Sequence, residues 1–346
     1  MTVPRGPASP AAPAETRTEP MLSRVADALF WTARYLERAE YVARLIDVGF
    51  HWELDFAGVS PEAQAAHWKV LAAILQQAER AGDPALDPDF AERFVLSLAF
   101  DPANPDSIVS CIAKARNNAR SVRGAIGAEM WTELNALYWK LEDREFRTQA
   151  RESPHDFFSA VESGARHWQG VCDATMTRDE GWHFLQLGRF LERADKTLRI
   201  LDASFAELSG PGRSSRGPEG ATDLHLANLQ WASVLRSCAA YHAFQRQHVG
   251  RIDADRVAAF LLLNSQSPRS VRFAFEATSR ALAGIEGPAP RGPGRSDRLL
   301  GRMLSDLDYV ELGALIEANG LHSFVADLQE RVGLVGAAVQ DQYALP

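Results

Sequence analysis

The stretch RYLERAEYVARLID, residues 34–47, is nearly repeated by RFLERADKTLRILD, residues 189–202. Seven of the fourteen aligned positions are identical, four more are conservative, and the offset is 155 residues throughout. In both copies apolar residues recur at helical spacing on one arc and charged residues fall on the opposite arc. The sequence therefore predicts two long amphipathic helices that are copies of each other.

The six charged positions of the first copy are also charged in the second, with an aspartate in place of one glutamate. One interpretation is a solvent-facing ladder of salt bridges. Surface pairs stabilise by only about 0–1 kcal/mol, which gives little reason for both copies to keep the same charges. We expect instead that the two faces meet and line a polar cleft, in which arginines bind carboxylate or phosphate and carboxylates bind amines. The candidate binding residues are Arg34, Arg38, Glu40 and Arg44 from the first copy and Arg189, Arg193, Asp195 and Arg199 from the second.

A weaker match extends the duplication beyond these helices. AERFVLSLAFDPANPDSI aligns with ADRVAAFLLLNSQSPRSV at an offset of 163, and no run of alternating β-branched residues bounded by hairpin turns is present. We therefore predict an all-α protein, a duplicated helical bundle whose two halves pack about a pseudo-two-fold axis. The predicted parts are a disordered tail at 1–20, a first half at 21–174, a second half at 175–337 that forms one compact unit with the first, and a C-terminal tail at 338–346.

Local signals set the expected ends of some segments. Thr177 and Glu180 form a T-x-x-E pattern, which predicts a capping box at the start of the second charged helix. Two Gly/Pro/Ser-rich stretches, 209–221 and 287–297, predict loops.

Composition limits the class of protein. The chain has 346 residues, and its 46% hydrophobic and 24% charged content is typical of globular proteins. A net charge of -8 leaves no basic excess for a nucleic-acid backbone, so no nucleic acid is expected as a partner. The longest apolar run, VAAFLLL, is far short of the ~18 residues of a membrane span, so no membrane is expected either.

Two features favour a cytoplasmic location. Residues 1–20 are rich in Pro and Ala but lack the apolar core of a secretory signal. Cys111, Cys172 and Cys238 are odd in number, far apart and outside any C-x-x-C spacing, which predicts neither a disulfide framework nor a zinc ribbon.

Two further arginine clusters are candidates for anion binding. One lies in ARNNARSVR, on one side of a predicted helix, and the other in PRSVRF, at the start of another helix. The alternative is that these arginines pair with the surplus acids of other helices. The residues are Arg116, Arg120 and Arg123 in the first cluster and Arg269 and Arg272 in the second.

Catalytic and metal-binding signatures are weak. Glu180 and His183 have the E-x-x-H spacing of di-iron helical bundles, and so do Glu152 and His155. Pro154 interrupts the second pair, capping accounts for Glu180, and the abundance of arginine disfavours a cation, so no metal or other cofactor is expected. The signatures of serine hydrolases, zinc metalloproteases, P-loop NTPases and dinucleotide-binding enzymes are absent from the sequence.

Four separated motifs give the chain a specific resemblance. MLSRVADALFWTARYLERAEYVARLID, ARNNARSVRGAIGAEMWTELNALYW, TMTRDEGWHFLQLGRFLERADKTLRILD and FLLLNSQSPRSVRF together resemble the bacterial alpha-E family, formerly domain of unknown function 403. The resemblance extends from Met21 to about Leu334. The glutamates that the resemblance points to are Glu37 and Glu192, and Asp195 stands where the first copy has Glu40.

The resemblance implies a cellular setting more than a reaction. Alpha-E proteins are similar in being encoded with, or fused to, circularly permuted ATP-grasp amidoligases, often near transglutaminase-like proteins and a proteasome-related peptidase. No ATP-grasp part is recognisable in this chain, so the resemblance implies a ligase on a separate polypeptide and a pathway of amide-linked peptides.

Three hypotheses follow. In the first, the chain is an accessory subunit that binds the ligase or presents an amino-acid or peptide substrate, with Glu37 and Glu192 receiving the amine. A stronger version makes Glu192 a general base, which requires a raised pKa. In the second, the chain is a stand-alone enzyme of peptide modification, assisted by a metal on Glu180 and His183. In the third, it is a purely structural scaffold.

Overall fold

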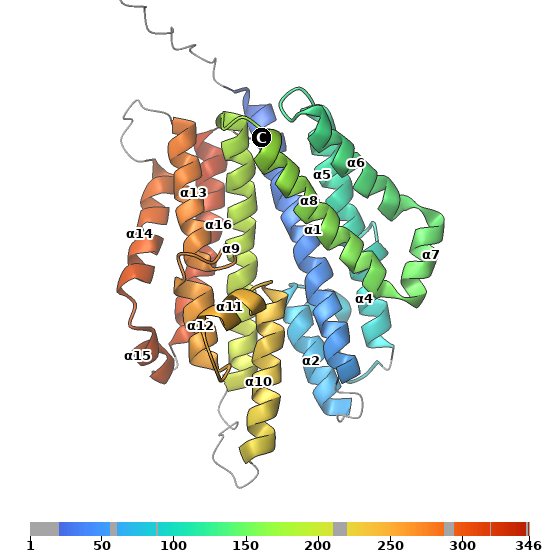
Figure 1. Ribbon diagram of the computed structural model, residues 1–346, viewed down its shortest axis with the longest axis vertical. Coiled ribbons are helices and arrows are strands. Elements are labelled where there is room, and N and C mark those ends of the chain that lie inside the picture. Colours follow the sequence, from blue (N-terminus) through green and yellow to red (C-terminus); the bar gives the residue numbers. More distant parts are fainter. Residues whose placement is uncertain are drawn as a thin grey trace, which may run out of the picture.

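The computed structural model describes residues 21–55, 61–87, 89–209, 220–286, 294–318, 320–343 and 345, with side chains except at 53–55, 61–63, 209 and 220–226. Over these ranges the chain forms sixteen helices and no strand, so the predicted all-α class is confirmed (Figure 1). No helix among the described residues has the length and apolarity that crossing a membrane requires. The tail predicted at 1–20 lies outside the described residues.

The helices fall into two successive sets of eight in the described ranges. The first set is α1 Ser23–Asp55, α2 Pro61–Ile74, α3 Ala78–Ala81, α4 Phe90–Phe100, α5 Ile108–Ser121, α6 Ala128–Glu142, α7 Arg144–Glu152 and α8 Pro154–Thr175. The second set is α9 Glu180–Ser209, α10 Gly220–Ser237, α11 Tyr241–Gln247, α12 Ala254–Leu263, α13 Val271–Glu286, α14 Arg295–Tyr309, α15 Leu312–Glu317 and α16 Leu321–Gln342.

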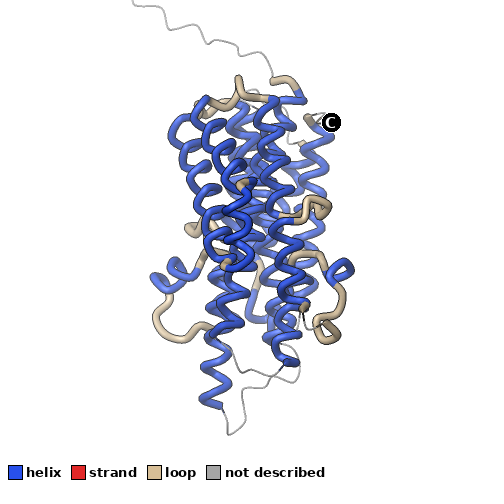
Figure 2. Tube along the Cα trace, turned by 90° about the vertical axis from the view of Figure 1, so that its right-hand side faces the viewer, coloured by secondary structure: helices blue, strands red, loops and turns tan. Residues whose placement is uncertain are grey.

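The two helices that carry the charged repeat, α1 and α9, pack against each other in the centre of the molecule. Helices α5 and α8 pack on α1, while α13 and α16 pack on α9. Helix α6 covers α5 and α8, and α14 covers α13 and α16. Most long helices follow the longest axis of the molecule (Figure 2). The charged faces of α1 and α9 therefore lie inside the bundle, between two flanking groups of helices.

A glycine brings the two central helices close together. A Cβ atom at Gly188 of α9 would lie 2.1 Å from the backbone oxygen of Phe30 in α1, so a larger residue would push the helices apart. Around this contact Phe30, Leu36, Leu187 and Leu191 are fully or almost fully buried. Burial of apolar surface of this kind stabilises by about 25 cal/mol per Å² and supplies most of the driving force for packing.

Some helix ends differ from the prediction. The expected capping box at Thr177 is wrong: the Asp179 carboxylate accepts from the Trp182 N–H at 3.1 Å, and Glu180 accepts from the Met21 N–H at 2.9 Å. Residues 338–342, expected as part of a tail, belong to α16. The apolar contacts of Val339 hold this last turn of the helix in the core.

The two predicted loops lie mostly outside the described residues. Residues 210–219 and 287–293 are not described, while the flanking residues belong to helices α9, α10 and α14 or, at 294, to the N-cap of α14.

Candidate functional site

The charged faces of α1 and α9 meet through two ion pairs that exchange partners. Arg193 of α9 donates to Glu37 of α1, with Nε–Oε1 at 2.6 Å and Nη2–Oε2 at 2.8 Å. In return Arg38 of α1 donates to Glu192 of α9, with Nε–Oε1 at 2.7 Å. The glutamate of each Glu-Arg dipeptide therefore forms an ion pair with the arginine of the other dipeptide.

The pair at Glu37 is enclosed. Glu37 and Arg193 are only 3% and 4% exposed, and the same carboxylate accepts from Gln169 at 3.0 Å and from Arg269 at 3.2 Å. Arg269 also donates to the fully buried Glu40 at 2.8 Å. A cavity of about 20 Å³ is left beside this group. We call Glu37, Glu40, Arg193 and Arg269 the closed cluster.

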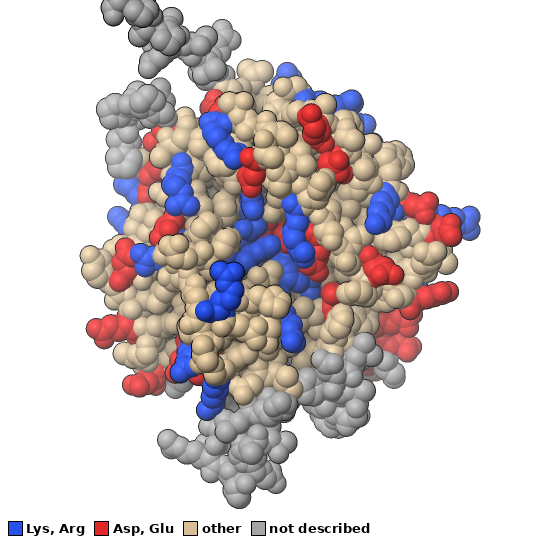
Figure 3. All heavy atoms as spheres, in the orientation of Figure 1, with Lys and Arg blue, Asp and Glu red and all other residues tan. Residues whose placement is uncertain are grey.

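Neighbouring side chains extend the closed cluster to α8. Arg44 Nη2 lies 2.9 Å from Glu40 Oε1, and Arg44 Nε lies 3.9 Å from Glu162 of α8. Arg166 of α8 lies 3.5 Å from Glu40 and forms a second ion pair with Glu162. Lys and Arg atoms gather in a hollow at the centre of the face drawn in Figure 3. The contacts of Arg44 and Arg166 leave the carboxylates of the closed cluster little room for a ligand.

The pair at Glu192 borders open space. Its fully buried carboxylate also accepts from Arg34 Nε at 2.8 Å and lies 3.6 Å from Lys196 Nζ. Arg38 reaches outward to Asp106 at 2.8 Å. The Arg34 and Arg38 side chains keep 18% and 19% of their surface exposed. Both guanidinium groups are therefore fixed by Glu192 yet accessible from outside.

A polar cavity of about 300 Å³ begins at these guanidinium groups. Four cationic side chains line it, together with two carboxylates, and Arg199 is itself held by Asp195 through bonds of 3.0 and 2.9 Å. We call this space, between α1, α2, α4, α9 and α16, the polar cavity. Its charged lining residues are Arg34, Arg38, Lys196, Arg199, Asp106 and Asp195, and its other lining residues are Tyr41, Val42, Leu75, Gln76, Leu98, Gln329, Val332 and Gly333.

The electrostatics keep both glutamates ionised. Burial by itself raises the pKa of Glu192, but Arg34, Lys196 and Arg38 outweigh it and hold the pKa well below its usual range. Burial opposes Arg193 in the same way at Glu37, whose pKa is also lowered. A general base requires a raised pKa, whereas the pKa of Glu192 is lowered, so its surroundings disfavour that role. The glutamates position arginines and do not carry protons at neutral pH.

The other expected binding residues lie apart from this site. Arg189 is 3.4 Å from Asp173, away from the carboxylates of the repeat. Arg272 pairs with Glu276 at 3.0 Å and with Asp308 of α14. The alternative of pairing with surplus acids therefore describes Arg272.

The arginines of α5 form a separate feature. Arg116 donates to Asn135 at 2.8 Å and stacks on Tyr138 of α6, with its guanidinium carbon 4.4 Å from the ring centre. Arg123 stacks on Trp131 at 4.5 Å, and Arg120 is exposed. This surface does not share residues with the polar cavity.

Sequence reasoning missed several residues of the site. Lys196 and Asp106 line the polar cavity, and Gln169 of α8 donates to Glu37. Lys196 follows Asp195 directly and could have been noticed as a charge on the same helix face. Asp106 lies one residue before the matched Ser107, so the weaker repeat contained a signal for it.

Residues that could hold a metal differ from those expected. Glu180 binds the Met21 N–H, and His183 packs against Gly284, so the pair does not converge on a shared position. Among the described residues, three side chains bring potential ligand atoms within 4.8 Å of one another: Asp47, His51 and His155.

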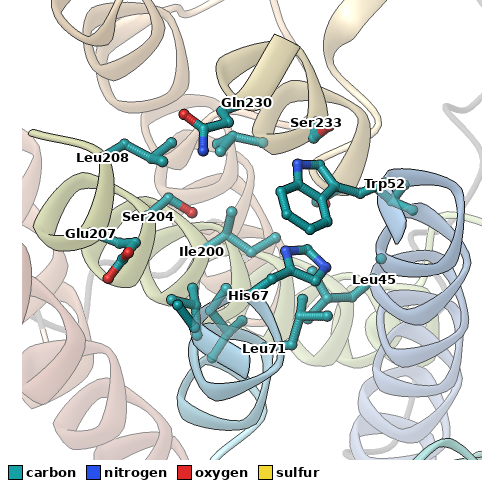
Figure 4. A pocket seen from close by; sticks show the side chains of 17 residues that line it. Leu45, Trp52, His67, Leu71, Ile200, Ser204, Glu207, Leu208, Gln230 and Ser233 are labelled. Carbon is teal, nitrogen blue, oxygen red and sulfur yellow. The ribbon is translucent and has the colours of Figure 1, made fainter. Parts of the chain in front are cut away.

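A second cavity, of about 170 Å³, lies between α1, α2, α9 and α10. On one side the Trp52 and His67 rings stack with centroids 4.1 Å apart (Figure 4). On the other side Ser204, Gln230 and Ser233 present polar groups. Burial lowers the pKa of His67 to about 4, so its ring is neutral at pH 7. This cavity suits an apolar group and is distinct from the polar cavity.

Comparison with known proteins identifies relatives of the chain. Residues 21–344 match the family described as a predicted alpha-helical domain with a conserved ER motif, and the two exchanged dipeptides are Glu-Arg sequences. Uncharacterized proteins of Mycobacterium tuberculosis and Mycobacterium bovis are 25% identical over 322 residues, covering 88% of this chain and 34% of each relative. The chain thus spans about a third of the length of these relatives. No solved structure matches.

Proposed function

The chain belongs to the Alpha-E family, and from this premise we propose that it is a binding protein and not itself a catalyst. In this proposal the polar cavity holds the carboxylate of an amino acid or a short peptide. The chain then acts as an accessory subunit of an ATP-grasp amidoligase or a related peptide-modification system, and presents the bound molecule to that partner.

The observation that carries the proposal is the fixed set of cations around the polar cavity. Glu192 orients Arg34 and Arg38, and Asp195 orients Arg199, so the donors are positioned before a ligand arrives. A guanidinium group binds a carboxylate through two parallel hydrogen bonds, which favours planar oxyanions over spherical ones. The volume of about 300 Å³ is at the lower end of the range for small-molecule sites.

Two acidic groups in the same cavity favour a zwitterion over a simple anion. Asp106 and Asp195 lie among the cations that line it. An amino acid or a peptide carries an ammonium group that can pair with a carboxylate while its own carboxylate faces the arginines. Inorganic anions lack this second point of attachment.

A binding role fits the ionisation of the glutamates. Glu37 and Glu192 are buried acceptors with lowered pKa values, so neither suits proton abstraction from an amine at neutral pH. The metal-assisted alternative is not favoured at Glu180 and His183, because Glu180 is bound to the Met21 N–H. Activation of the carboxylate would fall to the partner ligase.

The accessory role draws on the family and its relatives. The mycobacterial relatives are about three times as long as the matched region, so in them this domain is joined to further sequence in one chain. We propose the ATP-grasp ligase as the partner, with a transglutaminase-like protein as a further one. A cytoplasmic location is part of the proposal and agrees with three free, buried cysteines, Cys111, Cys172 and Cys238.

We further propose that α1–α8 and α9–α16 are duplicated halves related by a pseudo-two-fold axis. Their packing agrees with this: α5 and α8 pack on α1 and are covered by α6, as α13 and α16 pack on α9 and are covered by α14. The exchanged ion pairs agree as well, since a two-fold contact makes residue i meet j and j meet i.

Two smaller features support the same duplication. His155 Nδ1 lies 2.7 Å from Asp47, and His322 Nδ1 lies 2.6 Å from Asp202, at the same offset of 155 between the aspartates. Two residues beyond the ends of α2 and α10 lies a residue with positive φ, Gln76 at 57° and Ala239 at 52°.

Calorimetric titration with amino acids tests the binding proposal. We expect L-alanine, L-glutamate or the dipeptide Ala-Ala to bind, and the corresponding methyl esters not to bind, because the ester removes the charge that the arginines recognise. Arg199→Ala should weaken binding at least tenfold, whereas Arg272→Ala, at a surface pair outside the cavity, is the matched control. Esters that bind as well as acids, or an Arg199→Ala variant with unchanged affinity, would contradict the proposal.

Turnover of ATP by a separately expressed ATP-grasp ligase tests the accessory role. We expect the chain to stimulate turnover with the amino acid that it binds, and Glu192→Gln to lose that stimulation while remaining folded. The scaffold alternative, which the buried closed cluster favours, predicts instead that Glu192→Gln loses stability but that its folded fraction still stimulates. No binding to the ligase and no effect on turnover would rule out the accessory role.

A further inference from the structure

We infer that Asp47, His51 and His155 form a site for a divalent metal ion of the Zn²⁺ class. Asp47 and His51 are four residues apart on α1, so their side chains lie on one face of the helix. His155 is the second residue of α8, where Pro154 fixes the first turn. The three residues come from two helices that the fold brings into contact.

The donor types and distances match this kind of ion. Two imidazoles and a carboxylate are ligands that Zn²⁺ takes at about 2.0–2.2 Å, with a fourth position left for water or another group. His155 Nδ1 lies 2.7 Å from Asp47 Oδ1, and His51 Nδ1 lies 3.8 Å from the same oxygen. A tetrahedron with bonds of that length has edges of about 3.3–3.6 Å. His51 Nδ1 also lies 2.8 Å from the Asp47 backbone oxygen, so the His51 ring has to turn away from that oxygen to bring a nitrogen to the ion.

The surroundings allow an ion to enter. The side chains of His51 and His155 are 56% and 59% exposed, whereas Asp47 is 17% exposed. The carboxylate thus forms the inner wall of the site and the two imidazoles its rim. The His51 and His155 rings lie edge to face, with centroids 5.3 Å apart, so both reach the same side of Asp47.

The second half of the chain contains a similar aspartate–histidine pair but lacks a counterpart of His51. Asp202 and His322 form the same aspartate–histidine pair at 2.6 Å, on α9 and α16. At the offset of 155, however, the position of His51 is taken by Ala206, which is exposed. The correspondence between the two pairs rests on the proposed duplication, whereas the site at His51 rests on its own distances.

The assignment predicts that an ion joins α1 to the start of α8. Zinc binding to the folded chain should raise the unfolding temperature, because a ligand that binds only the folded state stabilises it by mass action. The fourth position would face solvent, so the ion could also take a ligand from a bound molecule or partner.

Titration of the chelator-treated full chain with Zn²⁺ alone tests the site. We expect one equivalent to bind to the unmodified chain and the unfolding temperature to rise with zinc. His51→Ala should weaken binding at least tenfold and remove the rise. His242→Ala, which removes an exposed histidine outside the cluster, is the matched control and should bind as the unmodified chain does.

The Ala206→His variant should gain a second zinc site. It adds the missing imidazole beside Asp202 and His322, so this variant should bind two equivalents, and the second should disappear when His322 is also replaced by alanine. Zinc binding that survives His51→Ala would overturn the site. A single equivalent bound to a folded Ala206→His variant would overturn the inference that these three side chains suffice.

Discussion

The two Glu-Arg dipeptides occupy equivalent positions in the repeat, yet one is closed and the other is open. Glu37 and Arg193 lie beside about 20 Å³ of free space, whereas Glu192 and Arg38 lie at the edge of about 300 Å³. Both carboxylates are buried and ionised, and both accept from an arginine of the opposite helix. The difference comes from the side chains that other helices add around the exchanged pairs.

Within the proposed duplication, two substitutions account for the difference. At the offset of 163, Arg269 corresponds to Asp106: the arginine fills the closed cluster, while the aspartate leaves room and turns to Arg38. The pairs of His155 and His322 place α8 and α16 at an offset of 167, so Arg166 corresponds to Gly333. Gly333 lines the polar cavity but has no side chain that could fill it. One of the two exchanged pairs is thus enclosed, and the other is left beside open space.

Glu37→Gln should have the largest effect on stability. The amide leaves Arg193 charged and buried without a counter-ion, while Arg269 keeps only its pair with Glu40, and we expect a cost of about 3–5 kcal/mol. Glu192→Gln should cost only about 1–3 kcal/mol, because Arg34 and Arg38 are reached by water from the polar cavity. Urea unfolding at pH 7 measures both.

Arg272→Ala is the control for this comparison, since its pairs lie at the surface and should contribute about 0–1 kcal/mol. Equal losses in the two glutamine variants would show that the open and closed environments do not differ in energy.

His67→Gln should change the response to acid. In the folded chain burial lowers the pKa of His67 to about 4, against 6.5 when unfolded. Between pH 6.5 and pH 4 the unfolded chain is protonated at His67 while the folded chain is not. The free energy of unfolding therefore falls by about 3 kcal/mol as the pH drops from 6.5 to 4, and it loses no more from this group below pH 4. Glutamine, the residue at the matching position 230, does not titrate and should remove this part of the loss.

Unfolding in urea at several pH values between 4 and 8 measures the difference between the variant and the unmodified chain. A difference that stays constant with pH would contradict the lowered pKa.

Asp106→Arg should convert the open site into a closed one. An arginine at this position can reach Glu192 and Asp195 as Arg269 reaches Glu37 and Glu40. We expect at least a tenfold loss of affinity for the amino acid that binds the unmodified chain, about 1.4 kcal/mol or more. The free energy of unfolding should change little. Retained affinity in this variant would place the ligand outside the polar cavity.

Much of the central architecture could be predicted from the sequence. Helical periodicity located the charged faces of α1 and α9, because amphipathic spacing reflects the same burial that packs the helices. The repeat also identified Glu37, Arg38, Glu192 and Arg193. It did not show that their charges neutralise each other, since pairing depends on the approach of the two helices, which Gly188 permits.

The shape of the site could not be predicted in the same way. Its free space depends on Asp106 and Gly333, which come from a loop and from α16, far from the repeat in sequence. The correspondence of α8 with α16 was not recognised either, because few residues apart from His155 and His322 match. Contacts made by single residues of distant helices leave no periodic signal.

Replacement of Gln76 or Ala239, the two residues with positive φ, by glycine should give the smallest change in the free energy of unfolding. The change should be the same for both residues. Gln76 and Ala239 follow α2 and α10 in the same motif: Gln77 N–H donates to Ala72 O at 2.9 Å, and Ala240 N–H donates to Leu235 O at 2.8 Å. A side chain in this conformation costs about 1–2 kcal/mol, and glycine gives back about 0.4–1 kcal/mol as entropy of the unfolded chain. Gln76→Gly and Ala239→Gly should therefore each stabilise by about 0.5–1 kcal/mol in urea unfolding.

The two variants should differ in binding, however, because Gln76 lines the polar cavity and Ala239 lines neither that cavity nor the closed cluster. Ala239→Gly should keep the affinity of the unmodified chain, while Gln76→Gly changes it by removing a polar side chain from the lining. Unequal gains in stability would show that the helix ends are not equivalent. Equal gains with equal affinities would remove Gln76 from the binding site and leave the arginines alone to define it.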